Sequence, residues 1–146
     1  MMKTQDILDM WVIDTKLDDL NLDLESIKVP MLHGKYLALL SKERAKVREL
    51  TANKKTLTRL LIAYYSGKAT QDELEKLGRE QFMERVIRGD IDERVTNDAA
   101  MIRLESMLGL HQECVMVLEE IMRSINNRGF QIKNVIDWRK LTVGMK

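Results

Sequence analysis

Hydrophobic residues recur at helical spacing along most of the chain, and few positions carry residues that stop a helix. Near the N-terminus, Ile7, Met10 and Trp11 follow this spacing, so the pattern predicts a short helix that Thr4 caps. Residues 14–25 are acidic and mix two periods of apolar positions, and we predict no secondary structure for them.

The longest uninterrupted pattern predicts a helix from about residue 30 to residue 66. Pro30, the one proline of the chain, fits the first turn of this helix, where the missing N–H costs little. Apart from Gly34, no interior residue of this segment favours a stop before Gly67. Gly67 suits a left-handed cap at the end of the helix.

The pattern in the second half of the chain predicts one short helix and one long helix. Thr70 and Glu73 have the spacing of a capping box for a short helix that ends at Gly78, and residues 79–88 are expected to add a turn or two. A second long helix is predicted from about Asp92 to Asn126. Its buried stripe is predicted to include these apolar residues: Val95, Ile102, Leu108, Val115, Leu118, Met122 and Ile125.

The last twenty residues are predicted to form a separate helix, because the run Asn126-Asn127-Arg128-Gly129 is expected to break the one before it. We interpret residues 127–146 as an oligomerisation element that follows a helical body at residues 1–126. The candidate contact residues are Phe130, Ile132, Val135, Ile136 and Trp138. A core helix that packs on its own chain explains the same pattern equally well.

Composition supports an all-α fold: an elongated single domain with two long helices plus short helices. The chain has 146 residues, seven glycines, one proline and 5% aromatic residues, which favours long helices over a sheet. No segment approaches the roughly 18 apolar residues of a membrane span, and the N-terminus lacks the apolar part of a secretion signal. The single cysteine, Cys114, is expected to be a buried small hydrophobe in a reducing, cytoplasmic protein.

Residue patterns typical of enzymes are missing from the sequence. It contains no glycine-rich phosphate loop, and His33 and His111 stand alone, as surface or satisfied core histidines. The run Asp90-Ile91-Asp92-Glu93 is interpreted as the start of a helix, where anions are favourable. No nucleophile, base and orienting partner occur together. We therefore expect no enzyme activity, no cofactor and no metal.

Positive charge is concentrated in one segment, Ser41 to Lys68. It holds eight basic and two acidic residues, a local charge of +6, whereas the whole chain carries +1. At about 100° per residue, Arg44, Arg48, Lys55 and Arg59 share one narrow stripe of the predicted helix. Apolar residues of the same helix cluster on a different face.

A stripe of like charges repels itself, so folding alone does not explain it, whereas binding to a phosphate backbone does. A solvated helix face is the simpler interpretation of the same charge run. Tyr64 and Tyr65 offer a stacking surface for bases, although their place on the helix favours a core or subunit contact. The candidate nucleic-acid-binding residues are Arg44, Arg48, Lys54, Lys55, Arg59, Tyr64, Tyr65 and Lys68.

Two segments of the chain resemble the UvsY family of phage recombination mediators. One runs from Lys54-Lys55 through Leu61-Ile62-Ala63-Tyr64-Tyr65-Ser66-Gly67-Lys68, and its spacing from Lys35-Tyr36-Leu37 is gapless against the family pattern. The other runs from Asn127-Arg128-Gly129-Phe130-Gln131-Ile132-Lys133 through Asp137-Trp138-Arg139 to Gly144. They cover about the second quarter and the last fifth of the chain. The family pattern has two cations, two residues apart, just before Tyr-Tyr-Ser-Gly; Arg59 matches the first, and Leu61 stands at the second.

The resemblance implies a helical homo-oligomer that binds single-stranded DNA in phage recombination, repair and recombination-dependent replication, in the host cell cytoplasm. It implies two protein partners, a RecA-like recombinase of the UvsX type and the phage single-strand-binding protein, which the recombinase replaces with the mediator's help. A ring-like assembly would multiply weak contacts. The alternative is a helical scaffold or adaptor of phage assembly whose basic face binds an acidic protein.

Overall fold

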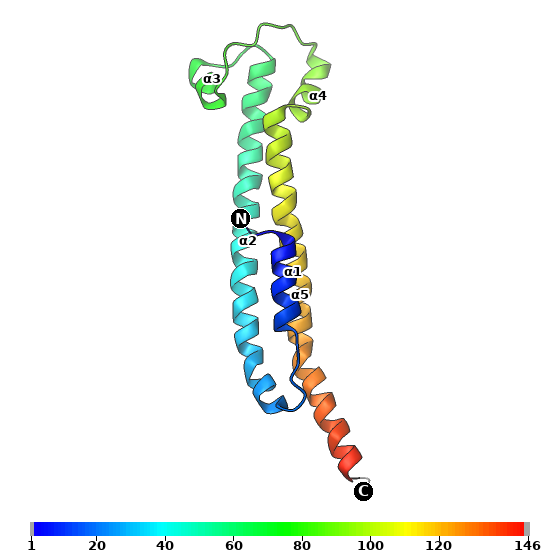
Figure 1. Ribbon diagram of the computed structural model, residues 1–146. Coiled ribbons are helices and arrows are strands. Elements are labelled where there is room, and N and C mark those ends of the chain that lie inside the picture. The colour runs from blue at the N-terminus through cyan, green and yellow to red at the C-terminus, as the bar shows by residue number, and fades with distance from the viewer. Residues whose placement is uncertain (1, 145–146) are drawn as a thin grey trace. The chain divides into compact units, whose positions relative to one another are not determined.

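The structure, a computed structural model, describes residues 2–144. Its elements are α1 (Thr4–Asp14), α2 (Leu22–Tyr65), α3 (Gln71–Leu77), the 3-10 helix η1 (Arg88–Asp90), α4 (Ile91–Thr96) and α5 (Ala99–Gly144) (Figure 1). The described residues contain no strand, so the prediction of an all-α protein with two long helices and several short ones is confirmed.

The described residues form two compact units, and both long helices contribute to each. The first unit holds α1, α2 up to Ala45, and α5 from Leu110 onward. The second unit runs from Lys46 to Gly109 and so holds the rest of α2, the short helices α3, η1 and α4, and the start of α5.

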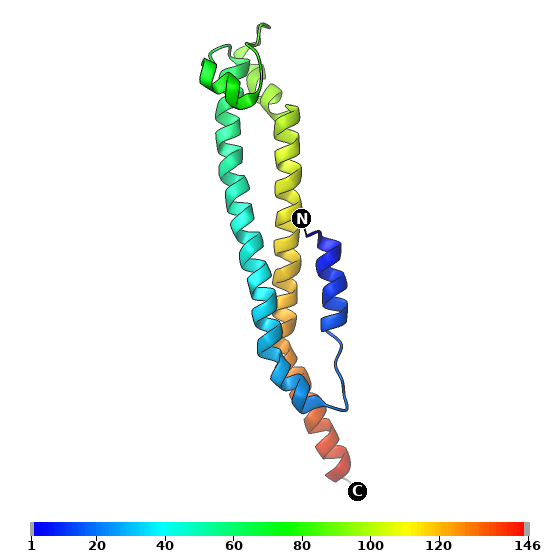
Figure 2. The ribbon, with the colours of Figure 1, turned by 60° about the vertical axis from the view of Figure 1, so that its left-hand side comes forward.

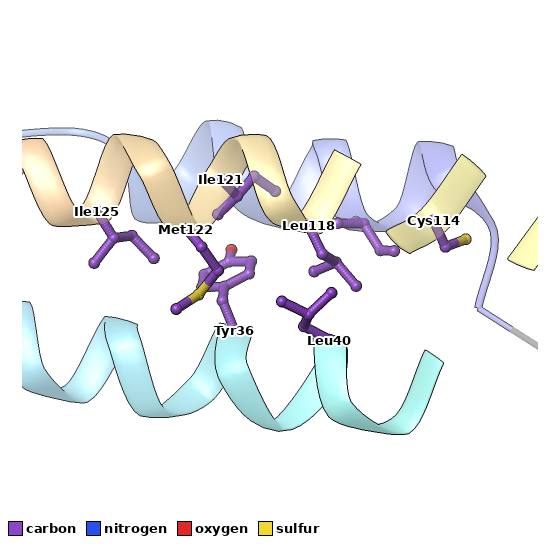
Figure 3. Close-up of a cluster of buried hydrophobic side chains, with 8 residues drawn as sticks. Tyr36, Leu40, Cys114, Leu118, Ile121, Met122 and Ile125 are labelled. Carbon is purple, nitrogen blue, oxygen red and sulfur yellow. The ribbon is translucent and has the colours of Figure 1, made fainter. Parts of the chain in front are cut away.

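The first unit is built around one apolar core that three helices share. Ile7 of α1, Tyr36 of α2 and Leu118 of α5 are completely buried, because helical spacing turns them toward one another. Figure 3 shows Tyr36 and Leu40 of α2 pointing toward a row of α5 side chains. The Tyr36 hydroxyl donates a hydrogen bond of 2.8 Å to Asp14, which fixes the end of α1 against α2. Cys114 is also buried in this core, as predicted.

The N-terminal end of α2 differs from the prediction. The helix begins at Leu22, so Pro30 lies inside it and not in its first turn. Asp18 stabilises the turn just before this earlier start. Its carboxylate accepts hydrogen bonds from the Leu20 backbone at 3.1 Å and from the Asn21 side chain at 2.7 Å. The first turns of α2 are inclined to the turns that follow them in the first unit (Figures 1 and 2), as expected for an interior proline. The start of α1 also differs, since Thr4 is its first residue and not its cap.

The predicted helix break at residues 126–129 is wrong, because α5 continues through them to Gly144. The buried Arg128 accounts for the continuity. Its guanidinium donates to the carbonyl oxygens of Thr15 and Lys16, at 3.0 and 3.1 Å, and lies 3.3 Å from the Glu25 carboxylate. These contacts hold the helix where local propensity alone favours a stop.

In the second unit, the local stop signals act as predicted. Gly67 ends α2 and Gly78 ends α3, each with a positive φ, 71° and 66°. The capping box of Thr70 and Glu73 starts α3, as the Thr70 hydroxyl accepts from the Glu73 N–H at 3.2 Å and the Glu73 carboxylate accepts from the Thr70 N–H at 3.0 Å. Three buried residues, Leu61, Val95 and Met101, form the core of this unit.

Two predictions for this unit are wrong. Residues 79–87 are not helical, and only the short η1 precedes α4. The second long helix does not begin at Asp92, because α4 ends at Thr96 and α5 starts anew at Ala99. Asp98 separates the two helices: its carboxylate caps α5 by accepting from the Ala100 N–H at 2.9 Å.

Candidate nucleic-acid interface

Three cations of α2, Arg48, Lys55 and Arg59, lie exposed on one face of the second unit, and we call them the cation stripe. They share a face because they are seven and four residues apart, so the axial separations are about 10 and 6 Å. The residues between them on this face, Thr51 and Ala52, are small and exposed. Small neighbours leave the cationic groups open to a ligand.

The cation stripe has no acidic partner at ion-pair distance. Within residues 2–144, no acidic oxygen lies within 4.0 Å of the side-chain nitrogens of Arg48, Lys55 or Arg59. Glu73 lies farther away. The pKa of Glu73 is lowered mainly by hydrogen bonds with Thr70 and, to a smaller degree, by the charge of Arg59. The stripe therefore presents three largely uncompensated positive charges to solvent.

Two other candidate cations carry acidic partners. Lys54 lies 3.0 Å from Glu105 of α5 in the second unit. Arg44 belongs to the first unit, where it lies 3.1 Å from Glu119. The predicted row of four uncompensated cations therefore reduces to Arg48, Lys55 and Arg59. Exposed ion pairs of this kind contribute about 0–1 kcal/mol, so they hold their cations only weakly.

Leu61, which stands where the family pattern has a second cation, is completely buried. It packs with Val95 and Met101 in the core of the second unit. A cation at this position would need a partner or a route to solvent, because burying an isolated charge is costly. Of the two family positions, only Arg59 is therefore placed to meet a ligand from solvent.

Tyr64 and Tyr65 lie in an aromatic cluster with Phe82, a residue that the sequence did not point to. The three ring centroids are 5.0–5.1 Å apart, and the Arg79 guanidinium lies 5.0 Å above the Tyr64 ring. The Tyr65 hydroxyl donates to Asp98 at 2.7 Å. Burial, followed by this hydrogen bond, raises the pKa of Tyr65. Both tyrosines are already packed within their own chain, which favours the core interpretation.

Lys68 lines an open cleft of about 560 Å³ in the second unit. The cleft is formed by the last turns of α2, the segment that follows α3, and the start of α4, which lie close together at the end of α2 (Figure 1). We call it the terminal cleft, and its lining residues are Ile62, Ser66, Lys68, Val86, Arg88, Ile91 and Asp92. Arg88 was missed because its segment has no helical period to mark which side chains share a surface.

The candidate oligomerisation residues of α5 divide into two groups. Phe130 and Trp138 are each 69% exposed, so their rings have little contact within the chain. Ile132 is buried at 2% exposure, and Val135 and Ile136 are half-buried. Of these five candidates, only Phe130 and Trp138 therefore present large apolar surfaces to a second molecule.

His111 has a structural partner. His111 is buried, and its Nδ1 lies 2.6 Å from the Glu43 carboxylate, which confirms it as a satisfied core histidine. Within residues 2–144, no group of three or more His, Cys, Asp or Glu side chains is arranged to hold a metal ion. None of the helices described is long and apolar enough to cross a membrane.

The chain is similar to known proteins over nearly its whole length. The model of the family described as "Recombination, repair and ssDNA binding protein UvsY" matches residues 10–145. Recombination protein uvsY of Enterobacteria phage T4 is 23% identical over 143 residues, which cover 98% of this chain and 99% of the relative. A crystal structure of the bacteriophage T4 recombination mediator protein UvsY matches with a TM-score of 0.84 at 23% identity, over 96% of this chain and 99% of the other. A second crystal form matches with a TM-score of 0.85 at 22% identity, over 98% and 99%.

Proposed function

Because the chain belongs to the UvsY family of recombination, repair and single-stranded DNA-binding proteins, we propose that it holds the DNA along the cation stripe. One observation carries this assignment: Arg48, Lys55 and Arg59 are exposed on one face without an acidic partner within 4.0 Å in the described part of the chain. Other basic residues of the same helix, such as Arg44 and Lys54, have such partners. Phosphates compensate the stripe and release counterions, which drives binding.

The number of cations predicts how strongly binding depends on salt. Each phosphate neutralised on single-stranded DNA contributes about −0.7 to the slope of log affinity against log salt concentration. Three phosphates per subunit therefore give a slope of about −2. A contact of this size is weak for a single subunit, so useful affinity requires several subunits on one strand.

We propose that the subunits assemble into a ring-like homo-oligomer through Phe130 and Trp138. Support comes from their exposure, 69% each, on the C-terminal part of α5. Large apolar rings of this kind are typical of interface centres. Once one subunit has bound a strand, the stripes of its neighbours meet the same strand at high effective concentration.

The proposed role is that of a mediator in the host cell cytoplasm that works by binding and not by catalysis. The chain would hold the strand for a RecA-like recombinase while the single-strand-binding protein is replaced. Family membership supports the recombination role. Support for a non-enzymatic role comes from the site itself, where the chemistry consists of cations and apolar side chains. No step of this role requires a cofactor.

The test is a titration of a fluorescent oligonucleotide at several salt concentrations. The variant Arg48→Gln/Lys55→Gln/Arg59→Gln is expected to lower affinity at least about tenfold at low salt and to flatten the salt slope toward zero. Circular dichroism should show unchanged helix content, because all three side chains are exposed.

A matched control removes the same charge elsewhere in the second unit. In Lys46→Gln/Lys76→Gln/Arg103→Gln, no residue belongs to the cation stripe. This control should keep most of the salt slope. Equal losses in both variants would mean that net charge, and not the stripe, drives binding. Negligible binding by the wild-type chain at low salt would overturn the proposed function and favour the adaptor with an acidic protein partner.

A further inference from the structure

The terminal cleft combines the features of a nucleotide site. Its volume of about 560 Å³ lies within the usual range of sites for small ligands, roughly 300–1,000 Å³. Apolar side chains of Ile62, Val86 and Ile91 line it, and Ile62 is 41% exposed although it is an aliphatic residue. This apolar lining suits the flat face of a nucleobase.

Two cations, Lys68 and Arg88, also line the cleft. Lys68 and Arg88 are exposed, and neither has an acidic oxygen within 4.0 Å among residues 2–144. Lysine and arginine in this situation bind phosphate, and a guanidinium plane also stacks on a base. Asp92 is the acidic residue of the lining. A carboxylate repels phosphate but accepts a hydrogen bond from a base amino group.

The terminal cleft continues the face that carries the cation stripe. Lys55, Arg59 and Ile62 are four and three residues apart, so they lie on the same side of α2, and Ser66 follows four residues later, just past the end of the helix. The Ser66 hydroxyl donates to the Ile62 carbonyl at 2.6 Å, which keeps this side chain close to the helix and out of the way of a ligand. A strand that follows the stripe toward the C-terminal end of α2 therefore reaches the cleft without leaving the second unit.

We propose that the terminal cleft binds one nucleotide of the single-stranded DNA, with the base against Ile62 and Val86 and the adjoining phosphates against Lys68 and Arg88. This inference rests on the proposed function, because the stripe delivers the strand. It adds an anchor that recognises a base, whereas the stripe contacts the backbone alone. The anchor fixes where on α2 the strand leaves the subunit.

The first test separates the cleft cation from its neighbours. Arg88→Gln is expected to lower affinity for an oligo-dC probe and to reduce the salt slope by about 0.7, the contribution of one phosphate. The matched control is Arg85→Gln, which removes the same charge three residues away, from an exposed side chain that does not line the cleft. Its slope should stay that of the wild type. Equal slopes in the two variants would overturn the proposal.

The second test asks whether the cleft contacts the base. Ile62→Ser/Val86→Ser is expected to lower affinity for oligo-dC several-fold and to leave affinity for an abasic strand of the same length unchanged, since the two probes carry the same phosphates. The control is Ile62→Ser/Ile87→Ser, which keeps Val86 and alters a neighbour that is 75% exposed and outside the cleft. It should lose less affinity. Equal loss on both probes would overturn the base contact.

The outcomes distinguish this inference from the proposed function. If the triple variant of the cation stripe loses binding while the Arg88 and Ile62/Val86 variants keep it, the terminal cleft is not a nucleotide site and the stripe stands. If the wild-type chain binds neither probe at low salt, the proposed function itself fails. A cleft that binds an acidic peptide but no oligonucleotide would also overturn the inference.

Discussion

Asp98 allows the sharpest test of how the second unit is held together. Its carboxylate accepts two hydrogen bonds from the Arg79 guanidinium, at 2.7 and 2.8 Å, and one from the Tyr65 hydroxyl at 2.7 Å. A fourth comes from the Ala100 N–H at 2.9 Å. These contacts join the end of α2, the segment after α3 and the start of α5. Substitution of this one carboxylate should therefore affect the whole unit.

The magnitude follows from the pKa of Asp98. The hydrogen bonds from Arg79 are the main cause that lowers this pKa from 3.8 to about 2. At about 1.36 kcal/mol per pKa unit, the ionised carboxylate contributes about 2.5 kcal/mol to stability. The Asp98 side chain is only 2% exposed, so solvent screens this contribution little. Asp98→Asn should lower the free energy of unfolding by about this amount at neutral pH.

The sign of the pH dependence is fixed by the direction of the shift. Because the folded-state pKa is the lower one, the contribution is complete above about pH 4 and is lost as the pH falls toward 2. Urea unfolding, followed by circular dichroism, should show the wild type and Asp98→Asn about 2.5 kcal/mol apart at pH 7 and nearly equal at pH 2. A control, Glu93→Gln, alters an exposed acid of α4 and should change stability by less than about 0.5 kcal/mol. A wild-type-to-variant difference that stays constant with pH would refute the reasoning.

Two further predictions concern the core and the surface. Leu61→Lys introduces the cation of the family pattern at a completely buried site, so the free energy of unfolding should fall by about 3 kcal/mol or more and DNA affinity should not rise. The melting temperature and an oligonucleotide titration measure the two effects. Higher affinity with unchanged stability would contradict the core assignment. Phe130→Ser/Trp138→Ser should lower the mass measured by light scattering toward that of one subunit while helix content stays the same, because both rings are 69% exposed; an unchanged mass would locate the interface elsewhere.

Local signals in the sequence predicted those features of the fold that local chemistry determines. Gly67 and Gly78 end their helices with positive φ, and the capping box of Thr70 and Glu73 starts α3. Asp98 was a missed signal of the same kind, since an aspartate before a run of helix-forming residues is a typical N-cap. This N-cap explains why the single helix predicted from Asp92 to Asn126 is divided into α4 and α5.

The predicted helix break at residues 126–129 is wrong because distant residues override local preference. Arg128 is buried by contacts with residues more than 100 positions away, and these keep α5 helical through Gly129. Neither propensity nor periodicity contains this information. The early start of the helix that contains Pro30 has a local cause instead, because Asp18 and Asn21 form the turn just before it.

The candidate site likewise has features that the sequence predicts and features that only the tertiary structure reveals. Spacing alone predicted that Arg48, Lys55 and Arg59 share a face, because the geometry of one helix fixes it. It could not reveal that Arg44 meets Glu119 or that Lys54 meets Glu105, since these partners lie on α5. The sequence did not predict the terminal cleft either, because Val86 and Arg88 come from a segment without a helical period.

The position of Arg128 determines which variants can test the role of the C-terminal part of α5. Shortening the protein after residue 126 removes more than the exposed rings of α5, because it also deletes the donor for the carbonyl oxygens of Thr15 and Lys16. The Glu25 carboxylate, which is 7% exposed, would then be left in the interior with no guanidinium beside it. Such a fragment would lose its fold and its oligomeric assembly together. The truncation could therefore not separate a loss of subunit contacts from a loss of folding. Point substitutions at Phe130 and Trp138 keep the two separate.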